Sequence, residues 1–343
     1  MSSLLIGWVM LVFFGILLRL ETLCAVEAVR GPMTFQSTSG ALNVAGSDHI
    51  RGTTASAFVW QQDQNNMNPG FHRHPNGGGL VADTAHVDET AYVGENSVVK
   101  DNASVLGKAC IDGSAQIYGN AKVSGNAIVY GDAQILENAH VYGNSRVYGD
   151  ACVYNSAQIF GNARVYGSAR ISGNALIYQD AAVYGHMVHV RDKARIYGNA
   201  QVTDDAEVCN FALISGDAQV SGNAIVSGHA HVFDNAHVSG WVSVYGSALV
   251  YDNAHVTGSV SVYGSALIGG NSLVCGHHSF SRDMDALLEA HIFGNACICG
   301  EASVSGTVHI SGEAHISGTA KIFGDAVISE GNFIEVTDLD VIK

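Results

Sequence analysis

Small and aliphatic residues alternate with polar ones in units of six along most of this chain. Over residues 87–183 an aliphatic residue occupies every sixth position, which gives 17 units. After one extra residue the pattern resumes over residues 190–334 and gives 25 more units. Of these 42 positions, 40 are Val or Ile, and the exceptions are Phe280 and Ala286. An internal repeat this strict decides the architecture before residue propensities are considered.

Each unit predicts one short strand and one corner. In residues 121–126 (Ala-Lys-Val-Ser-Gly-Asn) the small residue and the Val are two positions apart, so both point to the same, inner side of a strand. The β-branched residue favours an extended backbone. The Gly permits a positive φ, and the Asn, Asp or Ser after it favours a turn. A helix is excluded, because a period of six places no continuous stripe on a 3.6-residue turn.

Three units close a triangular coil of eighteen residues, and successive coils pair at about 4.8 Å. We therefore predict an all-β fold, a single-stranded parallel β-helix of about 14 coils over residues 80–334. Residues 1–28 form an apolar N-terminal segment, residues 29–79 a polar linker or N-terminal cap, and residues 335–343 a C-terminal tail. Part of the cap is expected to cover the first coil, because an open parallel edge pairs with other chains.

The repeat resembles the hexapeptide-repeat superfamily of left-handed β-helices, which includes trimeric acyltransferases. Residues 206–218 (AEVCNFALISGDA) look most like YdcK-like bacterial proteins. Bactofilin-type right-handed helices share a looser version of the pattern, and the strict six-residue period favours the left-handed form. The resemblance implies the fold and, as one functional alternative, coenzyme A-dependent O- or N-acyl transfer by a histidine general base. Acetyl-CoA or another acyl-CoA would then be the cofactor, and a homotrimer the assembly.

Charge and cysteine content exclude several classes of function. The formal net charge is −15, from 31 acidic and 16 basic residues, and no cluster of Lys or Arg exists to replace nucleic-acid counterions. Nucleic acid is therefore not an expected partner. The seven cysteines are odd in number and scattered, without the spacing of a zinc finger, so we expect neither a disulfide framework nor a metal site.

The N-terminus predicts export or membrane anchoring. Residues 4–18 (LLIGWVMLVFFGILL) form an apolar run of fifteen residues, which suits a signal-peptide core and is short for a spanning helix. Residues 26–28 (Val-Glu-Ala) offer a small-residue cleavage site. No Lys or Arg precedes the apolar run, so a signal anchor stays open as the alternative. The expected location is secreted, periplasmic or at the cell surface, with membrane contact only through this segment.

Two breaks in the repeat supply the catalytic candidates. The extra residue near His186 and His189 predicts a corner bulge, and the functional alternative is that it turns one of these histidines outward. Residues 275–289 (CGHHSFSRDMDALLE) span one coil in register but carry unsuitable inward residues, which indicates a decayed coil or a short extruded helix. Under the acyltransferase resemblance, His277 and His278 are the candidates for the general base.

Residues eighteen apart lie above one another, so surface columns can be read from the sequence. One column carries Arg146 and Arg164 and, corrected for the extra residue, is predicted to continue through histidines; a companion column carries tyrosines. The predicted ligand face comprises Arg146, Tyr148, Arg164, Tyr166, Tyr184, His237, His255, His291 and His309. A second face is predicted to stack Tyr142, Phe160, Tyr178 and Tyr197, with Phe233 and Tyr251 further along. Stacked rings stabilise a parallel sheet, and exposed ones also mark recognition surfaces.

Two functional classes follow. The first is an exported, non-catalytic β-solenoid that presents flat Arg/Tyr/His faces to a protein partner or a glycan, with no cofactor. The second is the acyltransferase that the resemblance implies. The solenoid is about twice as long as an acyl-transfer site needs, and acetyl-CoA is cytosolic, so the sequence favours the scaffold.

Overall fold

The computed structural model describes residues 69–276, 290–324, 326–329, 333–336 and 341–342 of the 343-residue chain. The chain divides into two units, residues 1–61 and 62–343, and everything described belongs to the second. This part is all-β, and it holds no helix of the length and apolarity needed to span a membrane. The apolar run at residues 4–18 lies outside the described residues.

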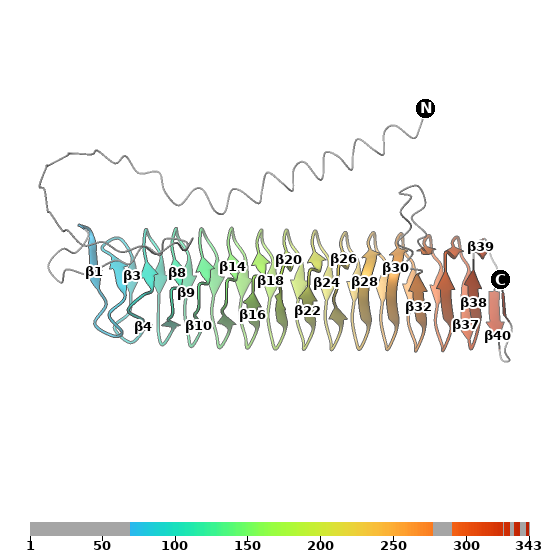
Figure 1. Ribbon diagram of the computed structural model, residues 1–343, viewed down its shortest axis with the longest axis horizontal. Coiled ribbons are helices and arrows are strands. Elements are labelled where there is room, and N and C mark those ends of the chain that lie inside the picture. Colours follow the sequence, from blue (N-terminus) through green and yellow to red (C-terminus); the bar gives the residue numbers. More distant parts are fainter. Residues whose placement is uncertain (1–68, 277–289, 325, 330–332, 337–340, 343) are drawn as a thin grey trace, which may run out of the picture. The chain divides into compact units, whose positions relative to one another are not determined.

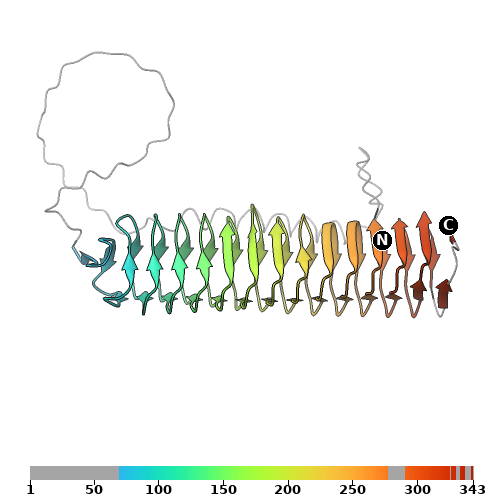
Figure 2. The same ribbon diagram turned by 90° about the horizontal axis from the view of Figure 1, so that it is seen from below.

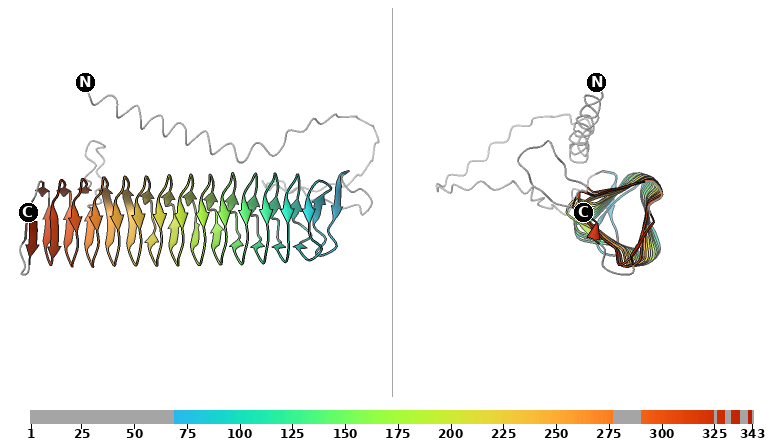
Figure 3. Two further views of the ribbon diagram at one scale, coloured as in Figure 1. Left: turned by 180° about the vertical axis from the view of Figure 1, so that it is seen from behind. Right: turned by 90° about the vertical axis from the view of Figure 1, so that its right-hand side faces the viewer.

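The strands form a three-sided rod, and each coil contributes one strand, or part of a longer one, to each side (Figure 1; Figure 3, right). The first face consists of β4 (Tyr92–Val93), β7 (Cys110–Ile111), β10 (Ile128–Val129), β13 (Arg146–Val147), β16 (Arg164–Gly167), β19 (Ala182–Gly185), β22 (Gln201–Asp204), β25 (Gln219–Val220), the starts of β28 (His237–Val244) and β30 (His255–Val262), β32 (Leu273–Gly276), β35 (Ser303–Gly306), β38 (Lys321–Gly324) and β41 (Val341–Ile342).

The second face adjoins the first, and β28 and β30 run through the corner between them. It consists of β2 (Leu80–Ala82), β5 (Val98–Val99), β8 (Gln116–Ile117), β11 (Gln134–Ile135), β14 (Cys152–Val153), β17 (Arg170–Ile171), β20 (His189–Val190), β23 (Glu207–Val208), β26 (Ile225–Val226), the ends of β28 and β30, β33 (Ala290–Ile292), β36 (His309–Ile310) and β39 (Val327–Ile328).

The third face is a separate sheet of fourteen strands. It consists of β3 (His86–Val87), β6 (Ser104–Val105), β9 (Lys122–Val123), β12 (His140–Val141), β15 (Gln158–Ile159), β18 (Leu176–Ile177), β21 (Arg195–Ile196), β24 (Leu213–Ile214), β27 (His231–Val232), β29 (Leu249–Val250), β31 (Leu267–Ile268), β34 (Cys297–Ile298), β37 (His315–Gly318) and β40 (Phe333–Val336). Figure 2 shows the strands of successive coils aligned along the rod.

Pairing between coils is parallel and follows the predicted eighteen-residue step. Arg146 pairs with Arg164 on the first face, Gln134 with Cys152 on the second, and His140 with Gln158 on the third. The parallel β-helix predicted from the six-residue unit is therefore confirmed. Near the extra residue the step is nineteen, since Arg170 pairs with His189.

One coil is much longer than the others. Val260 pairs with Ala290 and Val274 with Val304, each thirty residues later. Residues 277–289, including Phe280 and Ala286, lie outside the described residues. The coil that contains residues 277–289 is thus twelve residues longer than the regular eighteen, and the rod has about 13 turns where about 14 were predicted. Because twelve is a multiple of six, the sequence period continues across the insertion and hides it.

The core is a narrow stack of small and β-branched side chains. Ala163 and Val165 are 0% exposed, whereas Arg164 between them is exposed. Full burial of each Val or Ile contributes about 1.5–3 kcal/mol. The alanines take little room, which lets the three sides approach one another closely.

The choice of residue at a corner is restricted because the backbone of the next coil lies very close to it. Gly131 has a φ of 75°, and a Cβ there would lie 2.9 Å from the backbone nitrogen of Gly149 in the next coil. Where a polar residue takes such a position, its side chain in most cases accepts a hydrogen bond from the backbone of the next coil. Asp252, with a φ of 56°, accepts a hydrogen bond from the Gly270 N–H through Oδ2 at 2.9 Å. The polar residues of the repeat therefore tie coils together at the corners.

Residues just before the first coil cover its edge. β1 (Phe71–Arg73) pairs antiparallel with β2, and Phe71 lies opposite Ala82. His74 is only 4% exposed, and its Nε2 lies 3.0 Å from the Ala91 carbonyl oxygen. Residues 71–74 thus occupy hydrogen-bonding groups of the first coil that another chain would otherwise meet.

Candidate binding faces and a thiol–imidazole cluster

Four tyrosines stack in a ladder on the first face. The ring centroids of Tyr130 and Tyr148 are 4.7 Å apart, those of Tyr148 and Tyr166 also 4.7 Å, and those of Tyr166 and Tyr184 4.5 Å. The interplanar angles do not exceed 6°. The predicted tyrosine column is therefore present. Its rings cover one another's faces, so the ladder presents mainly ring edges and hydroxyl groups to solvent.

Two arginines lie beside this ladder. Arg146 and Arg164 are direct neighbours in register, and both are exposed. Neither guanidinium forms a salt bridge with any residue that the structure describes. Burial, and then the neighbouring tyrosines, raise the pKa of Tyr166, so its hydroxyl stays protonated at neutral pH. This part of the first face combines two positive charges with a row of hydroxyl groups.

The arginine column continues towards two of the predicted histidines. From Arg164 it passes through Ala182, Gln201, Gln219, His237, His255 and Leu273. The imidazoles of His237 and His255 stack with centroids 4.9 Å apart. Burial, and then His255, lower the pKa of His237. These two histidines lie on the predicted face but several coils away from Arg164.

The prediction for His291 and His309 is wrong. In the arginine column the residue after Leu273 is Ser303, thirty positions on. His291 and His309 instead pair with each other on β33 and β36, in the second face. The twelve residues added to the preceding coil shift every later residue by two sides of the triangle. Among the described residues, the first face therefore carries no continuous histidine column.

The catalytic candidates do not form a site in the described residues. The extra residue makes a corner bulge, as expected, where the backbone N–H groups of His186 and Met187 both point to the Asp204 carbonyl at 3.1 and 3.3 Å. His186 is exposed, Val188 takes the inward position, and His189 returns to strand β20. His277 and His278 lie outside the described residues.

The predicted aromatic columns of the third face are confirmed. Tyr142, Phe160, Tyr178 and Tyr197 stack at 4.9–5.0 Å, and Phe233 lies 5.4 Å from Tyr251. The second face carries a ladder that the sequence did not indicate, of Tyr245, Tyr263 and Phe293 at 4.9 Å per step. Its last step joins residues thirty positions apart, which an eighteen-residue column cannot show.

A shallow hollow lies at the corner between the third and first faces. It is lined by Gly216, Asp217, Asp234, Asn235, Asp252, Asn253 and Gly270. Its polar side chains bond within the corner: Asp217 accepts from Asn199, and Asn235 donates to Asn253. The carboxylates of this corner thus accept hydrogen bonds from neighbouring coils.

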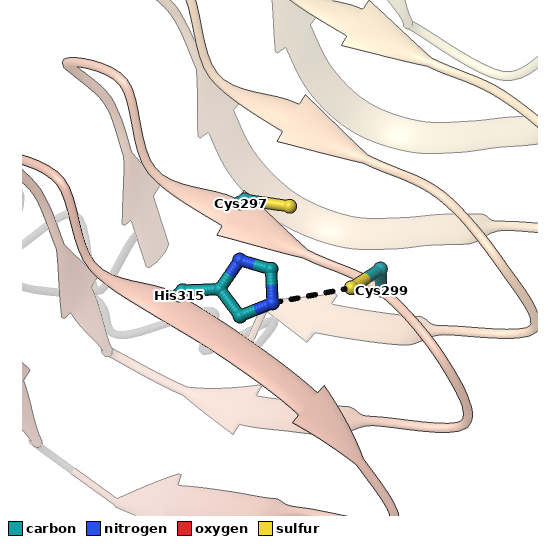
Figure 4. A group of neighbouring side chains, drawn as sticks. All are labelled: Cys297, Cys299 and His315. Atoms are coloured by element: carbon teal, nitrogen blue, oxygen red, sulfur yellow. Dashed lines mark hydrogen bonds between the residues drawn. The ribbon is translucent and has the colours of Figure 1, made fainter. Parts of the chain in front are cut away.

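Two cysteines and a histidine meet on the third face. Cys297 and Cys299 lie two positions apart at β34, and Cys297 pairs in register with His315 of β37. Figure 4 shows the two thiols and the imidazole facing a common space, and Cys299 Sγ lies 3.8 Å from His315 Nε2. All three side chains are half-buried, and their ligand atoms lie within 4.8 Å of one another. Burial, and then Cys299, raise the pKa of the Cys297 thiol to about 11.

The sequence prediction rested only on the linear spacing of the cysteines and did not identify this cluster. The sequence contained the pattern of this cluster, because Cys299 lies two residues after Cys297 and His315 lies eighteen residues after Cys297. Reading the cysteines along the columns, and not as a linear motif, would have found the cluster. None of the six cysteines in the described part of the chain forms a disulfide.

Some of the repeats are similar to a known kind of solenoid repeat. Five stretches match the family model described as YdcK Beta solenoid repeat, at residues 115–131, 121–137, 157–170, 169–185 and 218–234. No curated protein matches the chain. Among solved structures, a "putative acetyltransferase" from Desulfovibrio desulfuricans G20 aligns at 9% identity with a TM-score of 0.15. That alignment covers 66% of this chain and 66% of the other, just under two thirds of its length.

Proposed function

We propose that this β-solenoid, five stretches of which match the YdcK solenoid repeat, is a non-catalytic scaffold whose first face binds an extended, acidic partner. The observation that carries the proposal is the pair of exposed guanidinium groups of Arg146 and Arg164 beside the tyrosine ladder. An acidic polysaccharide is the class of partner that fits this face best.

Charge is the first argument. The two guanidinium groups lie on neighbouring strands, about 4.8 Å apart at the backbone, where like charges repel. The chain carries 31 acidic residues, yet no described carboxylate lies within salt-bridge distance of either group. Guanidinium groups bind carboxylates through two parallel hydrogen bonds. A partner that supplies carboxylates would therefore relieve the repulsion.

Shape is the second argument. The tyrosine hydroxyls repeat along the rod at the spacing of the ring stack, 4.5–4.7 Å, and they donate as well as accept hydrogen bonds. A regular, straight row of polar groups suits an extended polymer better than a compact small molecule. The stacked rings also hold the hydroxyls in place before binding, which lowers the entropy cost of association.

We further propose that the scaffold is exported or membrane-anchored. The support is the apolar run at residues 4–18 with the Val-Glu-Ala segment before residue 29. N-terminal sequencing of the chain isolated from its native cell tests this. A chain that starts at residue 29 supports a cleaved signal peptide, an intact N-terminus in the membrane fraction supports an anchor, and an intact N-terminus in the cytosol contradicts export.

Calorimetric titration of the purified chain with polygalacturonate tests the binding face. We expect binding that weakens with added salt and is lost in the double variant Arg146→Gln/Arg164→Gln. Arg195→Gln is the matched control, because Arg195 is also exposed but lies on the third face. Absence of binding, or equal binding by the double variant, would overturn the proposed face.

Titration with acetyl-CoA tests the catalytic alternative in the same sample. Micromolar binding that is lost when His277 and His278 are replaced, together with transfer of the acetyl group to an added acceptor, would show that the chain is an acyltransferase. Binding that depends only on Arg146 and Arg164, without acyl transfer, would instead reflect attraction of the coenzyme's phosphates to the first face.

A further inference from the structure

The thiol–imidazole cluster of the third face is independent of the first face and of the function proposed for it. Cys297 and Cys299 leave β34 on the same side of the sheet, and His315 of β37 lies directly above Cys297. The 3.8 Å between Cys299 Sγ and His315 Nε2 brings two successive coils together at their side chains (Figure 4).

The histidine contact itself recurs on this face. In two other coils a serine hydroxyl meets the imidazole of the histidine sixteen residues later, as Cys299 meets His315. These pairs are Ser124 with His140 at 3.2 Å and Ser215 with His231 at 2.8 Å. The solenoid therefore positions this imidazole by its own geometry, whatever the partner is.

What distinguishes the coil of β34 is the pair of thiols. The coil of Ser215 has Leu213 at the position that corresponds to Cys297. Leu213 and Ser215 offer the histidine one hydroxyl and no metal ligand of comparable strength. In the coil of β34 the same two positions are cysteines, so three soft or borderline donor atoms face one another.

We propose that Cys297, Cys299 and His315 bind a thiophilic metal ion, zinc in the first instance. A tetrahedral zinc ion, with Zn–S of about 2.3 Å and Zn–N of about 2.0–2.1 Å, holds a sulfur and a nitrogen about 3.6 Å apart and two sulfurs about 3.8 Å apart. The observed Cys299–His315 distance of 3.8 Å is close to this, and all three donor atoms lie within 4.8 Å of one another. Small rotations of the three side chains would bring their donor atoms to the distances of a tetrahedral zinc site.

A disulfide is the competing use of two neighbouring thiols, and the backbone disfavours it. Residues two apart in an extended strand have Cα atoms about 6.6 Å apart and nearly parallel Cα–Cβ bonds. A disulfide needs Cβ atoms about 3.5–4.5 Å apart, which these positions reach only by distorting the strand. A metal ion spans the wider separation without such distortion.

The ion would join β34 to β37 and so hold two successive coils together. The cluster follows immediately after the thirty-residue coil, where Leu267 pairs with Cys297 across the insertion. Since the unfolded chain does not hold the three donors together, metal binding stabilises the folded coils. Three protein ligands leave one coordination position for water, and the half-buried side chains leave the site open to solvent.

Metal titration of the reduced, full-length chain tests the site. We expect one Zn²⁺ per chain, a higher unfolding temperature with Zn²⁺ than with chelator, and thiolate-to-metal charge-transfer absorption when Co²⁺ replaces Zn²⁺. The double variant Cys297→Leu/Cys299→Ser recreates the Leu213–Ser215–His231 arrangement and is therefore expected to fold. The affinity of this variant for Zn²⁺ should fall by more than roughly 10- to 100-fold, which is the loss caused by replacing a residue that only hydrogen-bonds to a metal ligand.

Cys152→Ser is the matched control, because Cys152 is also half-buried but lies on the second face. This variant should bind Zn²⁺ as the wild type does. Two outcomes would overturn the proposal: no stoichiometric binding by the reduced wild-type chain, or equal binding by the folded Leu/Ser double variant. Formation of a Cys297–Cys299 disulfide under mild oxidation in the presence of Zn²⁺ would assign the thiols to redox chemistry instead.

Discussion

At the scale of single residues, the alternation of inward and outward positions decides what each side chain does. Val165 is fully buried between Val147 and Val183 of the adjacent coils, whereas Arg164 is exposed. Val165→Asp would bury an uncompensated carboxylate, and we expect it to lower the free energy of unfolding by at least about 3 kcal/mol. Arg164→Asp should change it by about 0.5 kcal/mol or less. Chemical unfolding followed by circular dichroism would show this, and equal tolerance of both changes would contradict the assigned register.

Partly buried histidines give the fold a dependence on pH. Burial lowers the pKa values of His140 and His231 from 6.5, so the neutral form is favoured in the folded state. Their contribution to stability is complete above about pH 6.5 and is lost as the pH falls towards the lowered folded values. We expect the unfolding temperature to drop between pH 7.5 and 5.5, above the ordinary range of carboxyl groups. His231→Gln should reduce that drop, and an unchanged slope would show that His231 does not contribute.

At the scale of elements, the six-residue unit was predictable and the insertion was not. The positions of Ala163, Val165 and the corner glycines follow from local sequence, because each residue's side is set within its own unit. The coil length is not local: a coil of thirty residues has the same six-residue period as one of eighteen. For this reason the tyrosine ladder before residue 276 was placed correctly, whereas His291 and His309 were assigned to the wrong face.

The tyrosine ladder is expected to stabilise the sheet that carries it. Tyr166 stacks on Tyr148 at 4.7 Å and on Tyr184 at 4.5 Å. Each such pair contributes about 0.5–1.5 kcal/mol beyond its buried area, so Tyr166→Ala should lower the free energy of unfolding by about 1–3 kcal/mol. Tyr166→Phe keeps both stacks and should cost less. Equal loss in the two variants, measured by chemical unfolding, would assign the stabilisation to the hydroxyl and not to the ring.

The thirty-residue coil offers a test of the coil geometry. Deleting residues 278–289 would leave Gly276-His277-Ala290, which matches Gly258-Ser259-Val260 one coil earlier and restores an eighteen-residue step. We expect the variant to keep its circular dichroism spectrum and its unfolding temperature.

Deleting nine residues, 206–214, from a regular coil should instead disrupt folding, because it exchanges inward and corner positions. Unfolding of the twelve-residue deletion would show that the inserted residues stabilise the rod.

At the scale of the whole solenoid, each coil contacts only the coils before and after it. Stability is then close to a sum of coil terms and of terms for the interfaces between coils, and the first coil differs because β1 precedes it in place of a coil. At the start of the rod, β1 and the buried His74 take the place of the missing coil. β1 pairs with β2 in the antiparallel direction, whereas successive coils pair in the parallel direction. A further coil therefore cannot be added on top of β1 in the same way.

Removal of the cap should therefore change how molecules associate more than how they fold. Without residues 69–79, the N–H and C=O groups of β2 that now pair with β1 become free to pair with a strand of another molecule. Light scattering across a range of concentrations should show growing assemblies for the deletion variant and a fixed mass for the intact chain. A fixed mass for both would mean that the exposed edge is protected by some other feature of the first coil.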